Sequence, residues 1–427
     1  MRRCSPPDWV ACSLAGALVL SSAGVSADGL GPPWSESGQL GVPEWAHSVT
    51  PKAQEPGTQG DMVLFVQPDR QSARRGVTAP GLSLPLFGQR RGSGCSGVWW
   101  LVGPVAWTCS DGAALSADDP SPGDSWASSI PQYFFVTHSD ANAYGSVAAI
   151  EQGSPDRQLE SGWGVAVVGH EAIAGERWAR TSKRLWIAET DVAAARPTTF
   201  HGQLLDGNLP DIAWVISDNA STWPTAADPP KGKRPVPLAH KARFEVVSVL
   251  EEQGSMLRVD DGAWMRKSDV ARPALSSPPV EVTGEHERWI DVDRASQTLV
   301  AYEGHRPVLA TLTSTGRELD DKTRTPAGVH RVWMKLLASD MGHAERDDAE
   351  ANYALEDVPY VQFFDNGIGL HGTYWHSDFG HPRSHGCVNL SLADAKWLFS
   401  FTNPRLPAAW TAAAPTIADA GTVVRVR

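Results

Sequence analysis

Short apolar runs separated by polar turns dominate the last third of the chain. The stretch "RWIDVDRASQTLVAYEGHRPVLATLTSTG", which starts at Arg288, holds three such runs, divided by turns at 293–296 and 303–306. "TPAGVHRVWMK", "VPYVQFF" and "GIGLHG" supply further runs of the same kind. Apolar runs of this length, rich in β-branched and aromatic residues, are typical of strands. The pattern predicts a mostly-β C-terminal domain with few helices.

One helix is predicted in this region, directly after a cysteine. Ser391 and Asp394 have the spacing of a capping box, with Asp in place of the usual Glu. The apolar positions that share one face of this helix are Leu392, Ala395, Leu398 and Phe399.

A repeated strand pattern precedes this region. "RTSKRLWIAETDVA" (180–193) aligns without gaps on "RVDDGAWMRKSDVA" (258–271), so that Trp186 matches Trp264. A fainter copy carries Trp107, at nearly the same interval before Trp186. The pattern predicts small β-barrels, each closed at one end by a tryptophan. These units resemble bacterial SH3-like domains, with expected bounds of 60–125, 130–199 and 208–273. The resemblance is compatible with binding of cell-wall peptides and equally with inert spacing.

Composition agrees with short strands and narrows the choice of partners. The chain has 427 residues, including 39 Gly and 32 Pro, so turns are frequent and long helices scarce. Its 18 Trp suit thin β cores, with stacking on sugars as the alternative. The formal charge of -12 argues against nucleic acid or anionic lipid as the main partner.

The start of the chain, over 1–27, has the pattern of a signal peptide. Arg2 and Arg3 precede the apolar run "WVACSLAGALVL", and a small-residue exit ends at Ala27. The apolar run is too short and too interrupted for a membrane span. We therefore expect export to the periplasm or cell envelope, no span after cleavage, and a flexible linker over 28–59.

Export also gives the cysteines distinct roles. Cys4 and Cys12 would leave with the signal peptide. Cys95 and Cys109 stand at the two ends of the strand-like stretch "CSGVWWLVGPVAWTC", and a disulfide between them would tie adjacent strands. Cys387 then remains as a single thiol, which is either a buried inert cysteine or a site of chemistry.

Two segments of the C-terminal region carry candidate chemistry. "LHGTYWH" ends an apolar strand, and "SHGCVNL" runs into the predicted helix. His371 and Cys387 are too far apart in the chain to share one helical face, and their spacing suits a loop that folds back on itself. An imidazole beside a thiol can accept its proton and form a thiolate–imidazolium pair. Amides at the start of the helix could supply oxyanion donors.

These segments, with the upstream "STG", "TPAG" and "VPYVQFF", resemble the catalytic domain of the L,D-transpeptidases, the YkuD family. The family signature is a His-Gly pair, a loop, and then Ser/Thr-His-Gly-Cys-hydrophobic-Asn/Arg. The resemblance covers about residues 285–427. It implies a β-sandwich or barrel with few short helices, and no cofactor.

The resemblance also assigns roles to individual residues. Cys387 would be the nucleophile and His371 the base, its ring held by a backbone carbonyl near Gly372. The amides of His385, Gly386 and Cys387 would face the tetrahedral oxyanion. The other expected site residues brace the loop (Ser384, Asn389), meet a substrate carboxylate (Arg383) and line the donor channel (Tyr374, Trp375).

The resulting functional hypothesis is an exported peptidoglycan L,D-transpeptidase that forms 3-3 cross-links from stem tetrapeptides. An L,D-carboxypeptidase or an enzyme that anchors wall-linked proteins would use the same nucleophile. A non-catalytic wall-binding protein is the alternative of a different class. The long acidic segment 336–358 departs from the family pattern and is interpreted as a loop that could act as a lid.

A metal site is the remaining alternative for this region. Imidazole and thiolate suit zinc, and four histidines precede or flank the cysteine (His371, His376, His381, His385). Their spacing fits no common zinc pattern, so no metal is expected. His376 and His381 are interpreted as solvated loop histidines.

Overall fold

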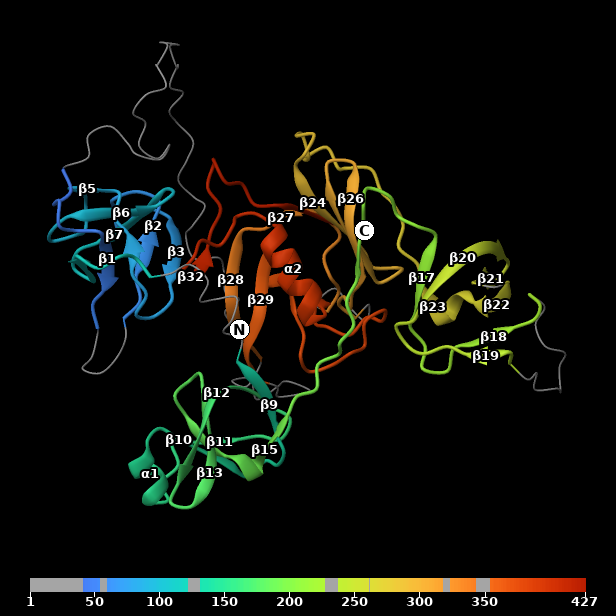
Figure 1. Cartoon of the computed structure of the whole chain (residues 1–427), viewed down its shortest axis with the longest axis horizontal. Helices are drawn as coiled ribbons and strands as arrows, with labels where there is room; N and C mark the ends of the chain where they lie inside the picture. The colour runs from blue at the N-terminus through green and yellow to red at the C-terminus, as the bar shows by residue number, and fades with distance from the viewer. Residues whose placement is uncertain are drawn as a thin grey trace, which may run out of the picture. The chain divides into compact units, whose positions relative to one another are not determined.

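The computed structural model describes residues 41–53, 60–121, 131–226, 237–260, 262–317, 323–342 and 354–427. The proposed signal peptide lies outside these residues. The chain divides into two compact units, one made of residues 1–129 with 404–421 and the other of 130–403 with 422–427. The described residues are mostly strand, with two α-helices, α1 (Val147–Glu151) and α2 (Leu392–Phe401) (Figure 1). The predicted mostly-β fold class is therefore confirmed.

Strands β1 to β23, except β16, form three groups, which we call modules 1, 2 and 3. Module 1 contains β1 (Ser48–Pro51), β2 (Val63–Phe65), β3 (Arg74–Thr78), β4 (Leu84–Pro85), β5 (Gly88–Arg90), β6 (Trp99–Gly103), β7 (Ala106–Cys109) and β8 (Ala113–Ser116). Module 2 contains β9 (Gln132–Val136), β10 (Ala141–Tyr144), β11 (Arg157–Leu159), β12 (Gly164–Ile173), β13 (Glu176–Thr181), β14 (Trp186–Ala188) and β15 (Val192–Ala194). Module 3 contains β17 (Ile212–Val215), β18 (Ser221–Trp223), β19 (Ala239–His240), β20 (Val246–Gln253), β21 (Met256–Val259), β22 (Ala263–Arg266) and β23 (Val270–Ala271).

All three modules pair their strands in the same way. The first strand pairs with the last, as in β1–β8, β9–β15 and β17–β23. It also pairs with a middle strand, as in β1–β4, β9–β12 and β17–β20. Short 3-10 turns at Glu189–Asp191 and Lys267–Asp269 stand at matching positions of the sequence repeat. The repeat is thus one strand topology used three times, while the likeness to SH3-like domains stays a prediction.

Module 1 departs from the predicted boundaries at both ends. Strand β1 falls inside the predicted linker 28–59, so this prediction is wrong for residues 48–51. Residues 404–421 belong to the same compact unit as module 1, although they follow α2. Their strand β32 (Trp410–Ala413) pairs antiparallel with β3. The expected contiguous domain 285–427 is therefore interrupted by a segment that completes module 1.

Trp410 and Arg75 hold this segment in place. Trp410 is 1% exposed and packs in the core of module 1. Arg75 on β3 donates to the carbonyl of Ala414 and pairs with Asp419 at 3.1 Å. Burial lowers the pKa of Arg75, and the Asp419 carboxylate opposes that shift.

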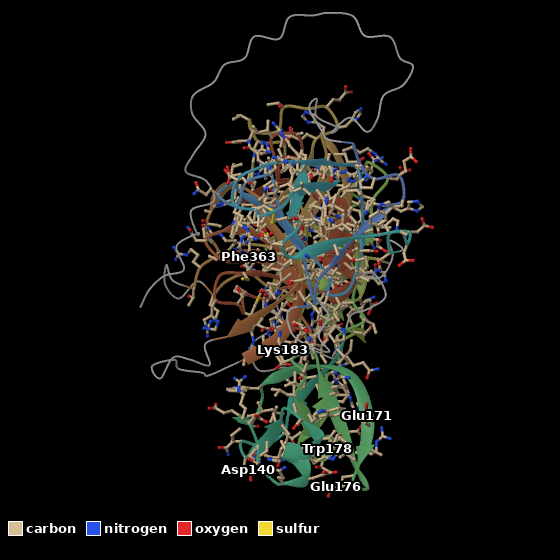
Figure 2. All side chains as sticks on the ribbon, turned by 90° about the vertical axis from the view of Figure 1, so that its left-hand side faces the viewer. Asp140, Glu171, Glu176, Trp178, Lys183 and Phe363 are labelled. Atoms are coloured by element: carbon tan, nitrogen blue, oxygen red, sulfur yellow. A yellow bond between two sulfur atoms is a disulfide. The ribbon has the colours of Figure 1, made fainter. Side chains whose placement is uncertain are left out.

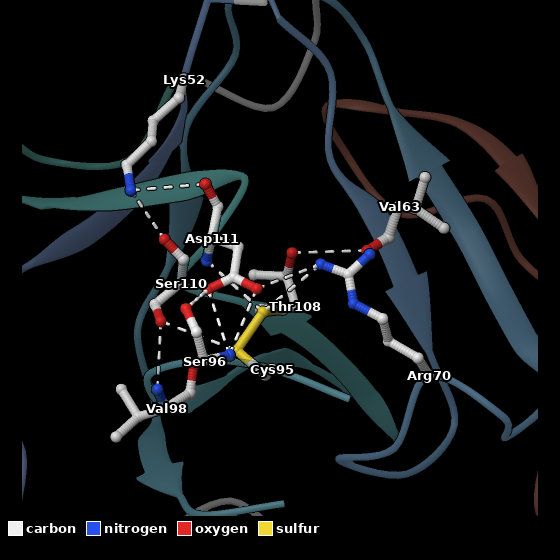
Figure 3. A network of polar contacts seen from close by, with 10 residues as sticks. Lys52, Val63, Arg70, Cys95, Ser96, Val98, Thr108, Ser110 and Asp111 are labelled. Atoms are coloured by element: carbon white, nitrogen blue, oxygen red, sulfur yellow. Dashed lines mark hydrogen bonds and ion pairs between the residues drawn. A yellow bond between two sulfur atoms is a disulfide. The ribbon is translucent and has the colours of Figure 1, made fainter. Parts of the chain in front are cut away.

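Module 1 also contains a disulfide, between Cys95 and Cys109. Asp111 makes polar contacts beside the disulfide. Its carboxylate accepts from the Ser96 amide at 3.2 Å and pairs with Arg70 at 3.4 Å (Figure 3). The Arg70 guanidinium also donates to the Cys109 sulfur at 3.7 Å. The loop that carries Cys95 is thus joined to β7 by covalent and polar links together.

The C-terminal domain has two sheets and α2. The first sheet has the order β16-β26-β25-β24-β33-β27. Its strands are β16 (Gln203–Leu204), β24 (Arg288–Asp293), β25 (Thr298–Glu303), β26 (Arg306–Leu312), β27 (Gly328–Arg331) and β33 (Val423–Val426). The second set runs β28 (Met334–Gly342), β29 (Ala354–Asp365), β30 (Ile368–Gly372) and β31 (Val388–Leu390), each paired with the next.

Helix α2 is fixed at both ends by buried polar groups. Ser391 Oγ accepts from the Asp394 amide at 3.1 Å, as the capping spacing predicts. The Asp394 carboxylate accepts from Ser391 Oγ, Gly202 N and Thr311 Oγ1. At the other end, the fully buried Lys335 donates to the carbonyls of Phe399 and Thr402. These contacts hold the helix that directly follows β31.

The segment 336–358 is a hairpin for most of its described length, which corrects the prediction of a long loop. Residues 334–342 lie in β28 and 354–365 in β29. Lys183 of module 2 pairs with Asp340 at 2.8 Å and with Asp357 at 3.0 Å. Figure 2 shows Lys183 at the opposite end of module 2 from Asp140 and Glu176. The end of the hairpin formed by the last residues of β28 and the first residues of β29 is therefore bound to module 2.

No helix among the described residues is long and apolar enough to cross a membrane.

Replacing Trp410 with Ala should destabilise module 1 selectively. The substitution removes a buried indole and leaves a cavity, which costs about 3–5 kcal/mol. We expect the amides of β3 to exchange hydrogen faster, measured by mass spectrometry on the full chain. Ile417→Ala serves as the control, because Ile417 is fully exposed in the same segment. Unchanged exchange in β3 would show that residues 404–421 do not hold this module together.

Candidate active site

Two neighbouring parallel strands bring the predicted base and nucleophile together. In the β30–β31 pair, His371 stands opposite Asn389 and Leu370 opposite Val388. Cys387 directly precedes β31. Continuing the register by one residue puts it opposite Gly369, which lies on β30 together with His371. Since side chains alternate along a strand, His371, Asn389 and Cys387 project from the same face. Strand spacing and rise place the Cα atoms of His371 and Cys387 roughly 8 Å apart, within the combined reach of the two side chains.

His371 has the hydrogen bonding and protonation of a neutral base. Its side chain is 1% exposed, and Nδ1 donates to the Gly372 carbonyl at 3.2 Å. This bond leaves Nε2 as the unprotonated nitrogen. Burial lowers the pKa of His371 to about 4, and the Gly372 carbonyl opposes the shift. The Trp375 ring stacks at 5.6 Å from the imidazole. His371 is thus oriented by a backbone carbonyl and is uncharged at neutral pH.

Cys387 is a free, half-buried thiol. Burial raises its pKa, against a smaller opposing effect of the Gly369 backbone. Among the described residues, the thiol and the His371 ring are not hydrogen bonded to each other. Both pKa shifts favour the neutral thiol and the neutral imidazole over a thiolate–imidazolium pair.

The turn before Cys387 is braced by hydroxyl groups. Ser384 Oγ accepts from the Gly386 amide at 3.0 Å and donates to the carbonyl of Cys387. Thr325 Oγ1 donates to the carbonyl of Gly386 at 2.8 Å. Gly386 has φ of +127°, a backbone conformation that residues with a Cβ rarely adopt. Ser384 thus has the expected contacts, but the Gly386 amide is engaged by Ser384 and is not a free oxyanion donor, contrary to expectation.

His376 lies beside the site, although the sequence suggested a solvated histidine. It is partly buried, and its Nδ1 accepts from the Asp378 amide at 3.1 Å. Its Nε2 lies 2.7 Å from the side-chain amide of Asn389. Burial lowers the pKa of His376 to about 4. This contact joins Nε2 to the amide nitrogen of Asn389, so the two side chains hold each other in place.

The remaining predicted residues divide into accessible and buried ones. Arg383 is 61% exposed and pairs through Nε with Asp378 at 3.4 Å. His385 is exposed, and its Nε2 lies 2.5 Å from the Arg317 guanidinium. Tyr374 is 2% exposed and stacks on Tyr133 at 3.9 Å, so the expectation that it lines an open channel is wrong. Its hydroxyl donates to the carbonyl of Glu356, which completes its burial.

A family model identifies the class of the C-terminal domain. Residues 287–426 match the family model described as the L,D-transpeptidase catalytic domain, YkuD. The C-terminal domain of this chain is a YkuD L,D-transpeptidase catalytic domain.

Solved structures give likenesses of limited extent. One is a mutant L,D-transpeptidase from Enterococcus faecium, 25% identical over 33% of this chain and 50% of that chain, with a TM-score of 0.25. The catalytic domain of the E. faecium enzyme is 26% identical over 34% of this chain and 100% of that chain, with a TM-score of 0.26. L,D-transpeptidase 3 from Mycobacterium tuberculosis is 19% identical over 43% of this chain and 74% of that chain, with a TM-score of 0.27. This chain covers about half the length of the first two structures matched. A search of curated proteins found no significant match.

The rate of acylation of Cys387 should decline only at unusually low pH. His371 accepts a proton only in its neutral form, and its pKa of about 4 keeps it neutral well below the ordinary value of 6.5. We expect the second-order rate constant for acylation by a carbapenem to stay level as pH falls to about 5 and to decline nearer pH 4. Stopped-flow measurements between pH 3.5 and 8 would show this profile. A midpoint at pH 6.5 or higher would contradict the buried neutral state of His371.

Acidification should also weaken the fold through the same histidines. A depressed folded-state pKa means that the unfolded chain binds more protons between pH 6.5 and about 4. Stability is therefore lost as pH falls through this window, by up to about 3 kcal/mol for each histidine. Denaturant unfolding at pH 7 and pH 4.5 measures the loss. His376→Gln should show a smaller loss than the wild type, and an equal loss in both would exclude His376 as a contributor.

Proposed function

We propose that the chain is an exported peptidoglycan L,D-transpeptidase that works through a Cys387 acyl-enzyme. The observation that supports this most directly is the register of β30 and β31, which puts His371 and Cys387 on one face within residues matched by the family model. His371 supplies a neutral imidazole and Cys387 a single thiol, the two groups that acyl transfer by cysteine needs.

In the first half-reaction, Cys387 Sγ attacks the carbonyl between the L-centre of the diamino acid and the terminal D-Ala of a stem tetrapeptide. His371 Nε2 takes the thiol proton and passes it to the departing amine of D-Ala. The C–N bond breaks, and the stem is left as a thioester on Cys387. Of the predicted oxyanion donors, the amides of His385 and Cys387 fit this role better than that of Gly386, which Ser384 engages.

In the second half-reaction, the side-chain amine of another stem attacks the thioester. His371 accepts the amine proton and returns it to the Cys387 sulfur as the C–S bond breaks. The product is a 3-3 cross-link. Arg383, which is exposed and only partly neutralised by Asp378, is suited to hold a carboxylate of the stem. Trp375, beside the imidazole, would line the donor side of the site.

Other acceptors would use the same acyl-enzyme. Water would make the chain an L,D-carboxypeptidase, and a lysine of a wall-linked protein would make it an anchoring enzyme. A non-catalytic wall-binding role is the alternative of a different class, and the intact His371 and Cys387 count against it. The charge of -12 fits a partner other than nucleic acid.

Incubation of the full chain with purified sacculi, followed by mass analysis of muropeptides, tests the proposal. Wild-type protein should produce 3-3 dimers. Cys387→Ala should abolish every acyl-transfer product, and His371→Ala should lower the rate by about 10²–10⁴-fold, as expected for loss of a general base. His330→Ala is the control, because His330 lies on β27 and contacts Pro326 and Phe364. Turnover by the cysteine variant would refute the mechanism, and tetrapeptide hydrolysis alone would identify a carboxypeptidase.

A further inference from the structure

The first strand of module 3 packs on two sides. Ala213 and Val215 of β17 belong to the module's own core. The alternate residues Ile212, Trp214 and Ile216 belong to a core shared with the first sheet of the catalytic domain, including Trp289 and Tyr302. Alternation along a strand explains how one segment serves both cores. Module 3 and the catalytic domain are therefore joined by buried apolar surface.

The loop between the base and the nucleophile enters this shared core. Phe379 is fully buried. Its ring lies 6.5 Å from that of Phe244 in module 3 and 6.2 Å from that of Phe200, which precedes module 3 in the chain. Gly380 has φ of +93°, and a Cβ there would lie 2.3 Å from Ile216 Cγ2. The next residue, His381, donates from Nε2 to the Ile216 carbonyl at 3.1 Å. The loop backbone thus rests directly on the end of β17.

Arg243 adds a charged contact to the same loop. Its guanidinium lies 3.6 Å from Asp218 of module 3 and 3.6 Å from Asp378 of the loop. It also donates to the Phe379 carbonyl at 3.4 Å. The Arg243 side chain is 19% exposed, so solvent screens these contacts less than it would at an open surface.

Asp378 is shared between two arginines. One of its oxygens faces Arg243, and the other faces Nε of Arg383 at 3.4 Å. If Asp378 were free of Arg243, both of its oxygens could pair with Arg383. Because Arg243 engages one oxygen, Asp378 neutralises Arg383 less completely. Arg243 thereby keeps the terminal nitrogens of Arg383 available to another anion.

We propose that Arg243 of module 3 is a positioning residue for the transpeptidase site. It fixes Asp378 and the backbone of Phe379, and through Asp378 it sets the charge and orientation that Arg383 offers to a carboxylate of the donor stem. This inference rests on the proposed function in its assignment of Arg383, while the loop contact itself does not. Module 3 is accordingly part of the catalytic unit rather than a spacer.

The test compares Arg243→Met with Arg258→Met in the full chain. Arg258 is the matched control, since it lies on module 3 and pairs with Glu251 at an exposed position. Each variant is assayed with a donor tetrapeptide carrying a free terminal carboxylate and with its C-terminal amide. For Arg243→Met, KM for the free acid should rise about tenfold, the equivalent of one charge-assisted hydrogen bond. KM for the amide should change little, and Arg243→Lys should recover part of the loss.

Hydrogen exchange of the loop gives a readout that needs no turnover. The amides of Gly380 and Arg383 bond to the carbonyls of Thr313 and Thr315, so exchange reports the docking of the loop. Arg243→Met should speed exchange over residues 376–386, while Arg258→Met should not. Equal KM and equal exchange in the two methionine variants would overturn the inference. Faster exchange in a chain whose wild type does not turn over stem peptides would support the positioning role and reject the proposed function.

Discussion

The parallel pairing of β30 with β31 is the constraint on which the site depends. A shift of one residue in that register would send the Cys387 side chain to the opposite face from His371. The register is secured from several directions. Helix α2 starts directly after β31 and is capped through Ser391 and Asp394, and Ser314 pairs with Asn389 on the other side. Buried polar contacts at the ends of these elements therefore determine whether a thiol and an imidazole can meet.

The protonation states follow from the same burial. Removing both groups from water favours their uncharged forms, which raises the pKa of Cys387 and lowers that of His371. A thiol is less readily oxidised than a thiolate, so burial also protects an unpaired cysteine. In the proposed mechanism, an oriented, neutral imidazole would therefore activate a protonated thiol.

The sequence predicted the parts of the fold and site that depend on local pattern. Short apolar runs indicated the strands, the Ser391–Asp394 spacing indicated α2, and the tryptophan-containing repeat indicated the modules. It could not show contacts made by residues distant in the chain. Nothing near Tyr374 indicates that Tyr133 will cover it, and nothing near Trp410 indicates that β3 is its partner. The prediction of a solvated His376 is wrong for the same reason, because Asn389 becomes its partner only once the loop has folded back.

These distant contacts have a common origin in the first strands of modules 2 and 3. Tyr133 lies near the start of β9, and Ile216 directly follows β17, in two modules whose first strands pair in the same way. Tyr133 covers Tyr374, near the start of the loop that follows His371. Ile216 packs against Gly380, in the middle of that loop. A strand whose alternate residues pack outward can bind a neighbouring domain without loss of its own core. Repetition of one module has thus supplied two supports for a single loop, and the distance from His371 to Cys387 depends on residues of both.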